Sequence, residues 1–436
     1  MKVTVIGTGY VGLIAGLGFA DFGNDVVCLD VIPEKVEALK AGKCPIYEPG
    51  AEDLLERSLR EGRIEFTTDA AYAIDFGEII FIAVGTPEDE NGDADMSYVY
   101  QTAKEIGMYM NDYKVIVDKS TVPIGTSRIV ADIIAKELEN RGLEYEFAVT
   151  SNPEFLREGH AVGDFQNPDR IVLGVDDARA EKKLKKLYRV FERSKKPIII
   201  TTPETAEMIK YASNAFLATK ITFINEIANL CDMVGANAIE VAKAMGADGR
   251  ISPKFLHPGP GYGGSCFPKD TKALAHTGRK VGAPMTVVES VIKANMHQKQ
   301  LAADKIIAAM PEGGDIAILG LAFKPETDDM RESPAITIIN ALIDSGKFRI
   351  KVYDPEAMST ARKVLPEEKL IWCKKTKEAI RDVDAIAVIT EWTEFRNLDA
   401  EYLAEIMPHG KIFDFRHVFD RTEVTDVGLD YYGMGF

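Results

Sequence analysis

A glycine-rich turn near the start of the chain constrains the fold more than any other feature. Gly7-Thr8-Gly9-Tyr10-Val11-Gly12 directly follows a β-branched run, Lys2–Ile6, and opens a helical segment. Asp30 ends the next such run. Gly7 would permit a tight turn, Gly9 a close approach of backbone N–H groups to a pyrophosphate, and Gly12 close packing of helix on strand. The order strand, glycines, helix, strand and acid predicts a dinucleotide-binding unit.

Asp30 and two later loops extend this prediction. A carboxylate at this position accepts hydrogen bonds from an adenosine ribose and repels a 2′-phosphate, so the pattern favours NAD over NADP. Lys35 is a candidate contact on the adenosine side. The loops that follow two later strands supply further candidate cofactor neighbours, namely Val84, Gly85, Thr86, Pro87, Ser120 and Thr121. Simple turns without a ligand are the alternative interpretation of these loops.

Short β-branched runs alternate with helix-like segments through the first part of the chain. The runs are Lys2–Ile6, Asp25–Asp30, Glu78–Val84, Lys114–Asp118, Glu146–Thr150, Arg170–Val175 and Pro197–Thr201. This alternation predicts a doubly wound parallel sheet with helices on both faces. We expect this first domain to comprise residues 1–200.

A different pattern begins at Pro203. Apolar residues recur at spacings of three or four as far as Val234, which predicts one long helix, and further helical segments follow up to Met310. Strands and a helix then alternate again, with strands expected at 316–320, 349–354, 384–389 and 411–415 and a helix at Pro334–Asp344. We therefore expect an α/β chain in which a central helical domain, 201–310, joins two Rossmann-like parallel-sheet domains, 1–200 and 311–436.

The charge and composition of the 436-residue chain exclude several classes of protein. Its formal net charge of −16 would repel nucleic acids and acidic membrane surfaces. No stretch reaches the roughly 18 to 20 apolar residues that span a membrane, and the first residues resemble a strand rather than a signal peptide, which indicates a cytoplasmic protein. The five cysteines form no CxxC pair, so we expect neither a disulfide framework nor a metal site.

One cysteine lies in a segment of small and charged residues, GGSCFPKD, from Gly263 to Asp270. No apolar periodicity there requires a core residue, and small neighbours let the main chain approach a ligand. Lys269 would favour the thiolate of Cys266, and Asp270 offers a base on the same turn. Cys266 is therefore a candidate nucleophile, with a buried structural cysteine as the alternative.

Polar side chains suited to oxygen chemistry occur at two further places. Lys210 and Asn214 are four residues apart in the long helix and therefore share a face, from which they would stabilise an oxyanion. Glu154 follows a predicted strand and is a candidate base for water. The alternatives are a solvated helix face for the pair and a turn or helix-cap acid for Glu154.

Taken in order, these segments resemble the nucleotide-sugar 6-dehydrogenase family over nearly the whole chain. The matching segments are GTGYVG with Asp30, VGTP, STVP, SNPEFLREG, Lys210-xxx-Asn214, GPGYGGSCFPKD, AFKPETDDMRES, VYDP, ITEW and the terminal DFR. GGSCFPKD together with EFLREG is highly specific and is most similar to the branch that acts on UDP-glucose. The resemblance implies a four-electron oxidation, in which UDP-glucose, two NAD⁺ and water give UDP-glucuronate and two NADH.

The resemblance also implies a covalent mechanism and a set of site residues. Cys266 would attack the aldehyde from the first oxidation, and the thiohemiacetal would be oxidised to a thioester that water hydrolyses. The implied catalytic residues are Cys266, Lys210, Asn214, Glu154, Asp270 and Thr121. The residues implied near NAD, besides those of the glycine turn, are Glu158, Lys269 and Arg331. The residues implied to contact the sugar nucleotide are Glu154, Phe155, Leu156, Arg157, Lys210, Asn214, Arg250, Phe255, Leu256, Gly259, Gly261, Tyr262, Gly263, Lys324 and Arg416.

Three points stay open. Phe415 stands where the family commonly has glycine, in Asp-Gly-Arg, which leaves the uridine-side geometry open. The alternative functions are the same chemistry on GDP-mannose or a UDP-N-acetylhexosamine, a two-electron β-hydroxyacid dehydrogenase, and a non-catalytic sensor of NAD or a nucleotide sugar. The resemblance implies a homodimer through the long helix, and higher oligomers are also open.

Overall fold

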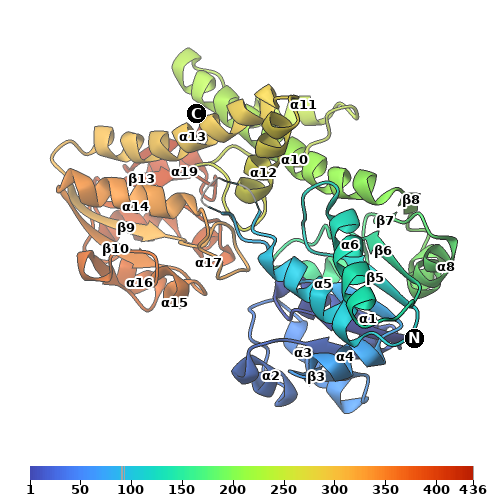
Figure 1. Cartoon of the computed structure of the whole chain (residues 1–436). Coiled ribbons are helices and arrows are strands. Elements are labelled where there is room, and N and C mark those ends of the chain that lie inside the picture. Colours follow the sequence, from blue (N-terminus) through green and yellow to red (C-terminus); the bar gives the residue numbers. More distant parts are fainter. Residues whose placement is uncertain (90–91, 93, 436) are drawn as a thin grey trace. The chain divides into compact units, whose positions relative to one another are not determined.

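The computed structural model describes residues 1–89, 92 and 94–435. The chain divides into two compact units, Met1–Ser213 and Asn214–Phe436, and the division falls within one helix, α10 (Pro203–Val234). Each unit contains one β-sheet (Figure 1). Helix α10 begins and ends where the apolar spacing predicts the long helix. Pro203 occupies its first position, where a backbone N–H would have no partner within the helix and proline is therefore tolerated.

The first unit is built on an eight-stranded sheet in the order β3-β2-β1-β4-β5-β6-β7-β8. Its strands are β1 (Lys2–Ile6), β2 (Asp25–Leu29), β3 (Ile64–Thr67), β4 (Ile79–Ile82), β5 (Lys114–Asp118), β6 (Phe147–Ser151), β7 (Ile171–Gly174) and β8 (Ile198–Thr201). The pairs from β3 to β6 are parallel, as is the pair β7 and β8. The chain order changes direction between β1 and β4, which is the position at which sheets of this kind bind ligands.

The expectation of a fully parallel first sheet is wrong at one junction. Strands β6 and β7 are antiparallel and meet through Ser151 and Gly174. The segment between them carries only a six-residue helix, α7 (Ala161–Gln166), whose Phe165 ring stacks edge-on at 5.3 Å against Phe19. Two parallel neighbouring strands are normally connected by a longer crossover helix that lies along the sheet, and the segment between β6 and β7 has no such helix.

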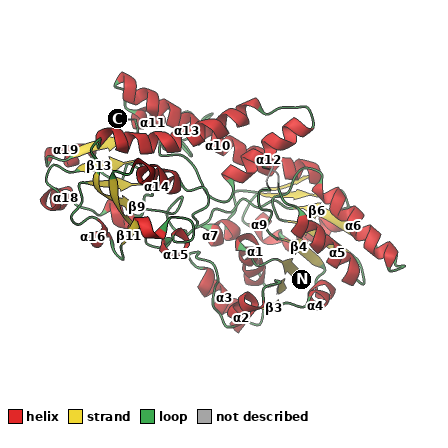
Figure 2. Cartoon of the chain, turned by 60° about the vertical axis from the view of Figure 1, so that its left-hand side comes forward, coloured by secondary structure: helices red, strands yellow, loops and turns green. Residues whose placement is uncertain are grey.

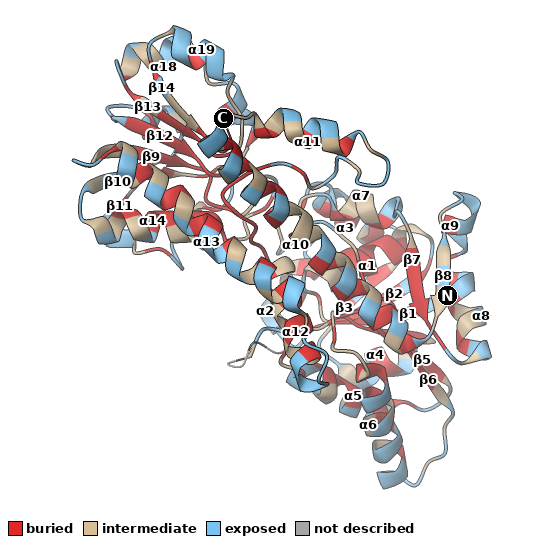
Figure 3. Cartoon of the chain, turned by 90° about the horizontal axis from the view of Figure 1, so that it is seen from above, coloured by how far each residue is buried: buried red, intermediate tan, exposed pale blue. Residues whose placement is uncertain are grey.

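Helices cover both faces of the first sheet. They are α1 (Tyr10–Asp21), α2 (Pro33–Lys40), α3 (Ala51–Arg60), α4 (Ala70–Phe76), α5 (Ser97–Tyr109), α6 (Thr126–Asn140), α7, α8 (Ala178–Leu187) and α9 (Arg189–Arg193). Alternate residues of β4 enter different cores: Ile79 and Phe81 pack with α1, whereas Ile80 and Ile82 pack with α5. Burial on both faces explains why these strands are continuously apolar (Figure 3).

The second unit contains a six-stranded parallel sheet in the order β11-β10-β9-β12-β13-β14. Its strands are β9 (Gly314–Leu319), β10 (Phe348–Tyr353), β11 (Leu370–Trp372), β12 (Ala385–Val388), β13 (Lys411–Asp414) and β14 (Asp430–Gly433). Its helices after α10 are α11 (Ala238–Gly246), α12 (Phe267–Lys280), α13 (Thr286–Ala309), α14 (Pro334–Ser345), α15 (Met358–Ala361), α16 (Thr376–Ala379), α17 (Thr393–Arg396), α18 (Ala400–Ile406) and α19 (Arg421–Asp426). Figure 2 separates these helices from the strands by colour.

The expected strands and helices are present, together with three strands that the sequence patterns do not predict. The missed strands, β3, β11 and β14, all lie at sheet edges. Strands β3 and β14 mix polar and apolar residues and β11 has only three residues, so no extended apolar run marks any of the three. No helix of the described residues is long and apolar enough to cross a membrane.

Candidate active site

The turn between β1 and α1 has the geometry that its glycines predict. Gly7 has a φ of +95°, and a Cβ there would lie 2.7 Å from the Ala83 carbonyl O. A Cβ at Gly12 would overlap the carbonyl O of Gly7. Apart from Gly9 itself and its two chain neighbours, no described residue has an atom within 4 Å of a Cβ built on Gly9, the residue before α1. Gly7 and Gly12 are therefore required by packing, whereas the space beside Gly9 leaves the positive end of α1 open to an anion.

Asp30 lies directly behind this turn. Its Oδ2 accepts hydrogen bonds from the Thr8 amide at 2.9 Å, from Thr8 Oγ1 at 2.6 Å and from Lys35 Nζ at 2.8 Å. Burial raises the pKa of Asp30, but the hydrogen bonds from Lys35 and Thr8 outweigh it and hold that pKa below its usual value. Lys35, predicted on the adenosine side, thus pairs with Asp30 and keeps its carboxylate ionised.

The loops after β4 and β5 are bonded to each other. Thr86 Oγ1 donates to the Thr121 carbonyl O at 2.9 Å, and Ser120 Oγ donates to the Val84 carbonyl O at 2.7 Å. Both loops leave the carboxyl ends of neighbouring strands. The structure therefore brings together, at the ligand-binding edge, two loops that the sequence predicts as cofactor neighbours.

The loop after β6 carries a buried ion pair. Lys210 Nζ lies 3.0 Å from Glu154 Oε1 and donates to the Glu154 carbonyl O at 2.7 Å. Lys210 is 2% exposed and Glu154 is 6% exposed. The Phe155 ring is close to two cations, with the Arg170 guanidinium 3.7 Å and Lys210 Nζ 5.5 Å from its centroid. The solvated-face interpretation of Lys210 is therefore wrong.

Lys119 joins this buried cluster and was not singled out by the sequence analysis. Its Nζ donates to Asn152 Oδ1 at 3.1 Å, and Tyr188 Oη donates to the same oxygen at 2.5 Å. Burial lowers the pKa of Lys119 to about 8, with Glu154 opposing this shift and Lys210 adding to it. In the sequence, the feature that could have indicated Lys119 is a lysine directly after a buried strand.

Two other predicted residues of this loop have different surroundings. The Arg157 guanidinium forks onto Asp164, with distances of 2.9 and 2.6 Å, and is largely exposed. Glu158 is half-buried in the same loop.

In the second unit, Cys266 is the residue immediately before α12. It is half-buried, and its Sγ lies 3.4 Å from Ser265 Oγ. The positive end of the helix dipole favours an anionic atom at this position. The loop setting and partial exposure of Cys266 agree with the nucleophile hypothesis and contradict the alternative of a buried structural cysteine.

Asp270 lies one turn after Cys266 and is fully buried. Its Oδ2 accepts a hydrogen bond from Asn214 Nδ2 at 2.6 Å, and Lys269 Nζ lies 3.1 Å from its Oδ1. The amide of Asp270 donates to the Cys266 carbonyl O at 2.8 Å. The second unit therefore places a carboxylate and an ammonium in the first turn of α12, directly after the cysteine, and an amide of α10 against that carboxylate.

The loop before Cys266 is held by buried amide side chains. Asn225 Oδ1 accepts from the Gly259 amide at 2.9 Å, and Asn295 Oδ1 accepts from the Tyr262 amide at 2.8 Å. Gln298 Nε2 donates to the Gly259 carbonyl O at 2.9 Å. None of these three residues was expected from the sequence, where each is a polar side chain on the buried face of a helix.

Three basic residues of the second sheet domain, Lys324, Arg331 and Arg416, are expected at the site. Of these, Arg416 lies against the loop before Cys266. A Cβ on Gly259 would be 3.1 Å from Arg416 Nη1, and Arg416 Nε donates to the Ile389 carbonyl O at 2.7 Å. Phe415 points into the core, where its ring centroid is 6.3 Å from that of Phe413. The substitution of glycine by phenylalanine therefore leaves Arg416 beside the loop.

Arg331 and Lys324 come from the segment after β9. The Arg331 side chain is exposed and forks onto Asp329, whereas its carbonyl O accepts from the Gly264 amide at 2.8 Å. Lys324 Nζ lies 5.3 Å from the Phe323 centroid. Arg331 thus supports the cysteine loop through its backbone.

The segment with Arg250, Phe255 and Leu256 forms a separate loop in the second unit. Lys220 Nζ donates to three of its carbonyl oxygens, those of Ile251, Ser252 and Lys254, at 3.0, 3.1 and 2.5 Å. Arg250 is exposed and forks onto Asp248, Phe255 has a φ of +65°, and Leu256 is buried.

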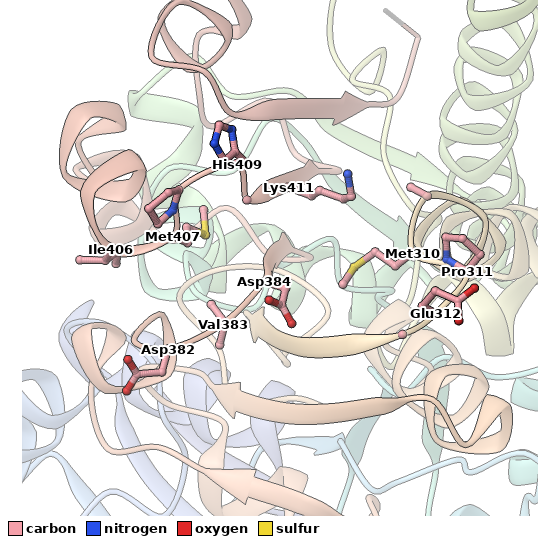
Figure 4. A pocket seen from close by; sticks show the side chains of 14 residues that line it. Met310, Pro311, Glu312, Asp382, Val383, Asp384, Ile406, Met407, His409 and Lys411 are labelled. Atoms are coloured by element: carbon pink, nitrogen blue, oxygen red, sulfur yellow. The ribbon is translucent and has the colours of Figure 1, made fainter.

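A hollow of about 440 Å³ lies at the other edge of the second sheet (Figure 4). Its labelled residues include Glu312, Asp384 and Lys411, which lie at the amino ends of β9, β12 and β13. Arg416 and the segment with Lys324 leave the carboxyl ends of the same strands. Because ligands of such sheets bind at the carboxyl edge, we assign no function to this hollow.

The fold and the glycine turn define a class: a dinucleotide-binding α/β enzyme with a cysteine at a helix N-terminus. The chain belongs to the UDP-glucose/GDP-mannose dehydrogenase family. Residues 1–192 match the family's NAD binding domain, residues 204–297 its central domain and residues 317–421 its UDP binding domain. The family membership and the NAD cofactor expected from the sequence are thereby confirmed.

Individual relatives match over the full length. UDP-glucose 6-dehydrogenase of Rhizobium meliloti is 48% identical, with 100% of this chain and 99% of the relative covered. UDP-glucose 6-dehydrogenase TuaD of Bacillus subtilis is 45% identical, with 100% and 93% covered. The solved UDP-glucose dehydrogenase of Pyrobaculum islandicum is 37% identical, with a TM-score of 0.92 over 100% of this chain and 98% of that one.

Proposed function

We propose that this chain oxidises UDP-glucose to UDP-glucuronate, reducing two NAD⁺ and consuming one water. Cys266 at the start of α12 carries the proposal, because a nucleophile there explains how both oxidations occur on one enzyme without release of the aldehyde. Full-length similarity to UDP-glucose 6-dehydrogenases and the match to a UDP binding domain support the choice of substrate.

In the first unit, the glycine turn and Asp30 would hold NAD⁺, with Lys35 fixing Asp30 and the Val84–Pro87 and Ser120–Thr121 loops alongside. When bound, NAD⁺ would supply the hydride acceptor for oxidation at C6 of the sugar. Thr121, Glu158, Lys269 and Arg331 are proposed to lie near NAD on the basis of the family resemblance. The residues present suit the dinucleotide, because the space beside Gly9 and the open end of α1 accept a pyrophosphate.

The proposed chemistry begins at the C6 hydroxyl. As hydride leaves C6, the hydroxyl proton passes to a water held by Asp270, whose carboxylate is fixed by Asn214 and Lys269. Cys266 Sγ then bonds to C6 of the aldehyde, and its thiol proton transfers to the carbonyl oxygen. A second hydride and proton leave this thiohemiacetal and give the thioester.

Hydrolysis completes the proposed reaction. Glu154, held by Lys210, takes a proton from water as the water oxygen bonds to C6. The C6–Sγ bond breaks, and Cys266 is released with the carboxylate product. Lys210 and Asn214 stabilise the oxyanions in these steps.

The family resemblance supports the rest of the sugar-nucleotide set. Phe155, Leu156, Arg157, Arg250, Phe255, Leu256, Gly259, Gly261, Tyr262, Gly263, Lys324 and Arg416 are proposed to bind UDP-glucose. In an acidic protein, Arg416 and Lys324 supply local positive charge for the diphosphate.

NADH stoichiometry tests the proposal. Purified protein is incubated with NAD⁺ and each of UDP-glucose, a UDP-N-acetylhexosamine and GDP-mannose, and NADH and product charge are measured. We expect two NADH per UDP-glucose and an acidic product. One NADH per substrate would support the two-electron dehydrogenase, and no NADH with any sugar would support a sensor.

Cysteine variants test the covalent step. Cys266→Ala is expected to abolish complete turnover, and Cys266→Ser to slow it strongly or trap an ester. Cys44→Ser, which changes another half-buried cysteine, is the matched control and retains two NADH per sugar. Undiminished full turnover by Cys266→Ala would exclude the thioester.

We further propose a cytoplasmic homodimer formed through α10. Phe216, Phe223 and Leu230 repeat at seven-residue intervals, or two turns of the helix, and are 66%, 47% and 57% exposed. Such an apolar stripe is stabilised by a second copy. Light scattering is expected to give the dimer mass for the wild type and a monomer for Phe223→Glu; a wild-type monomer at all concentrations would contradict it. Cell fractionation tests the location.

A further inference from the structure

A carboxylate outside every motif of the sequence connects two parts of the first unit. Glu48 lies in the segment between α2 and α3 and is buried. Its Oε2 accepts from the Gly159 amide at 2.6 Å, and its Oε1 accepts from the Ala161 amide at 2.6 Å and from the Val162 amide at 3.4 Å. One side chain thus binds three amide donors of the segment that follows β6.

The same carboxylate binds the glycine turn. The Tyr10 hydroxyl donates to Glu48 Oε2 and accepts from the Gly159 amide at 2.8 Å. Tyr10 is the first residue of α1 and a member of the dinucleotide fingerprint. Tyr10, Glu48 and Gly159 therefore form a closed hydrogen-bonded triangle, in which the charged acceptor strengthens the bonds to it.

The segment held by this triangle bears residues of the proposed chemistry. Two further carboxylates shape it: Glu154 Oε2 accepts from the Leu156 amide at 2.5 Å, and Asp164 accepts from the Arg157 amide at 2.9 Å. Gly159 has a φ of +78°, so its conformation depends on external bonds more than that of an ordinary residue. Displacing the Gly159 amide would move the end of the loop that begins with Glu154.

We propose that Glu48 is a positioning residue of the reaction, which fixes the loop of Glu154, Phe155 and Leu156 relative to the dinucleotide turn through Tyr10 and Gly159. This proposal rests on the proposed oxidation of UDP-glucose. In this proposal Glu48 acts through the loop that it holds, by its bonds to Tyr10 and to the amides of Gly159 and Ala161. Loss of its negative charge would loosen the loop while leaving both sheets intact.

The test compares Glu48→Gln, Tyr10→Phe, the double variant and the control Glu56→Gln, an exposed glutamate of α3. Glu48→Gln keeps the shape of the side chain but replaces one carboxylate oxygen by an NH2 group, which would face a backbone N–H donor. We expect the KM for UDP-glucose to rise about tenfold in Glu48→Gln and about threefold in Tyr10→Phe, with kcat changed less. The double variant should resemble Glu48→Gln, because both changes break one triangle.

Hydrogen exchange separates positioning from general stability. Amides of Gly159 and Ala161 should exchange faster in Glu48→Gln, whereas those of β1 and β5 keep wild-type rates and Glu56→Gln behaves as wild type. An unchanged KM, additive effects in the double variant, or faster exchange throughout the unit would overturn the proposal. If the wild type does not oxidise UDP-glucose, the proposed function fails. In that case the exchange rates of the Gly159 and Ala161 amides in Glu48→Gln, together with its NADH affinity, still show whether Glu48 fixes the loop. Tyr10→Phe provides the same test if Glu48→Gln does not fold.

Discussion

Lys210 and Glu154 form an ion pair in the interior of the first unit, with Nζ 3.0 Å from Oε1. Both side chains are almost completely buried, so neither charge has solvent to replace a lost partner. Loss of one partner from a pair of this kind typically costs about 3–5 kcal/mol. The proposed catalytic group and its orienting cation are therefore also structurally dependent on each other.

The first prediction follows from this dependence. Lys210→Met should lower the free energy of unfolding by a few kcal/mol, because the Glu154 carboxylate stays buried without its ammonium. Adding Glu154→Gln to Lys210→Met removes the stranded charge and should restore part of that loss. Denaturant unfolding of both single variants and the double variant measures this coupling. Strictly additive losses would contradict it.

The second prediction concerns Glu154→Gln alone. The substitution removes the proposed base while keeping the size of the side chain, so turnover should fall by about 10² to 10⁴-fold. The thioester on Cys266 would then accumulate after two hydride transfers. Rapid mixing should show a burst of two NADH per subunit, and intact mass should show the sugar nucleotide attached to the protein. A variant without a burst or an adduct would show that hydrolysis does not depend on Glu154.

The third prediction separates two glycines of one turn. Gly9→Ala places a methyl group in open space and should weaken NAD⁺ binding with little change in the melting temperature. Gly12→Ala drives a methyl group into the Gly7 carbonyl and should lower the melting temperature strongly. Calorimetric NAD⁺ titration and thermal unfolding distinguish the two. Equal melting temperatures for both variants would refute the assigned roles.

The fourth prediction concerns Asp118, which is fully buried and whose two carboxylate oxygens have no hydrogen-bond partner among the described residues. Burial, with a contribution from Glu207, raises its pKa to about 8. In the unfolded chain the pKa is near 4, so between about pH 4 and pH 8 the folded state holds a proton that the unfolded state has lost. Stability from this group therefore falls as pH rises through that window.

Asp118→Asn removes this dependence. The variant should resemble the wild type near pH 5 and exceed its free energy of unfolding near pH 8 by an amount on the order of a few kcal/mol. Urea unfolding at both pH values checks the difference. Ser58→Ala, a buried change without a charge in the same unit, should show the same offset at both pH values. A constant offset for Asp118→Asn would contradict the prediction.

The parts of the fold that were predictable follow from local periodicity. Strand β1 and helix α10 begin and end where the sequence predicts, because apolar runs and three-to-four spacing are written into neighbouring residues. Edge strand β14, Asp430–Gly433, lacks such a run. The antiparallel entry of β7 depends on how α7 packs, which no local pattern encodes.

The site residues divide in the same way, into those that a local sequence pattern predicts and those that depend on packing. The glycine turn, Asp30 and the Lys210 helix were predictable because each motif has a fixed spacing. Glu48 was not, since its amide partners lie more than a hundred residues along the chain, as with Gly159 at a separation of 111. The choice of Asp270 as the partner of Asn214 likewise depends on helix packing rather than on spacing.

The order of the first sheet has a consequence for how the unit is made. From β4 to β8, each strand is added beside the strand synthesised before it, and β4 itself pairs with β1, which already exists. This half of the sheet can therefore grow outward during translation without waiting for residues still to be made. A ribosome-bound chain that ends after β5 already has partners for every strand it has produced.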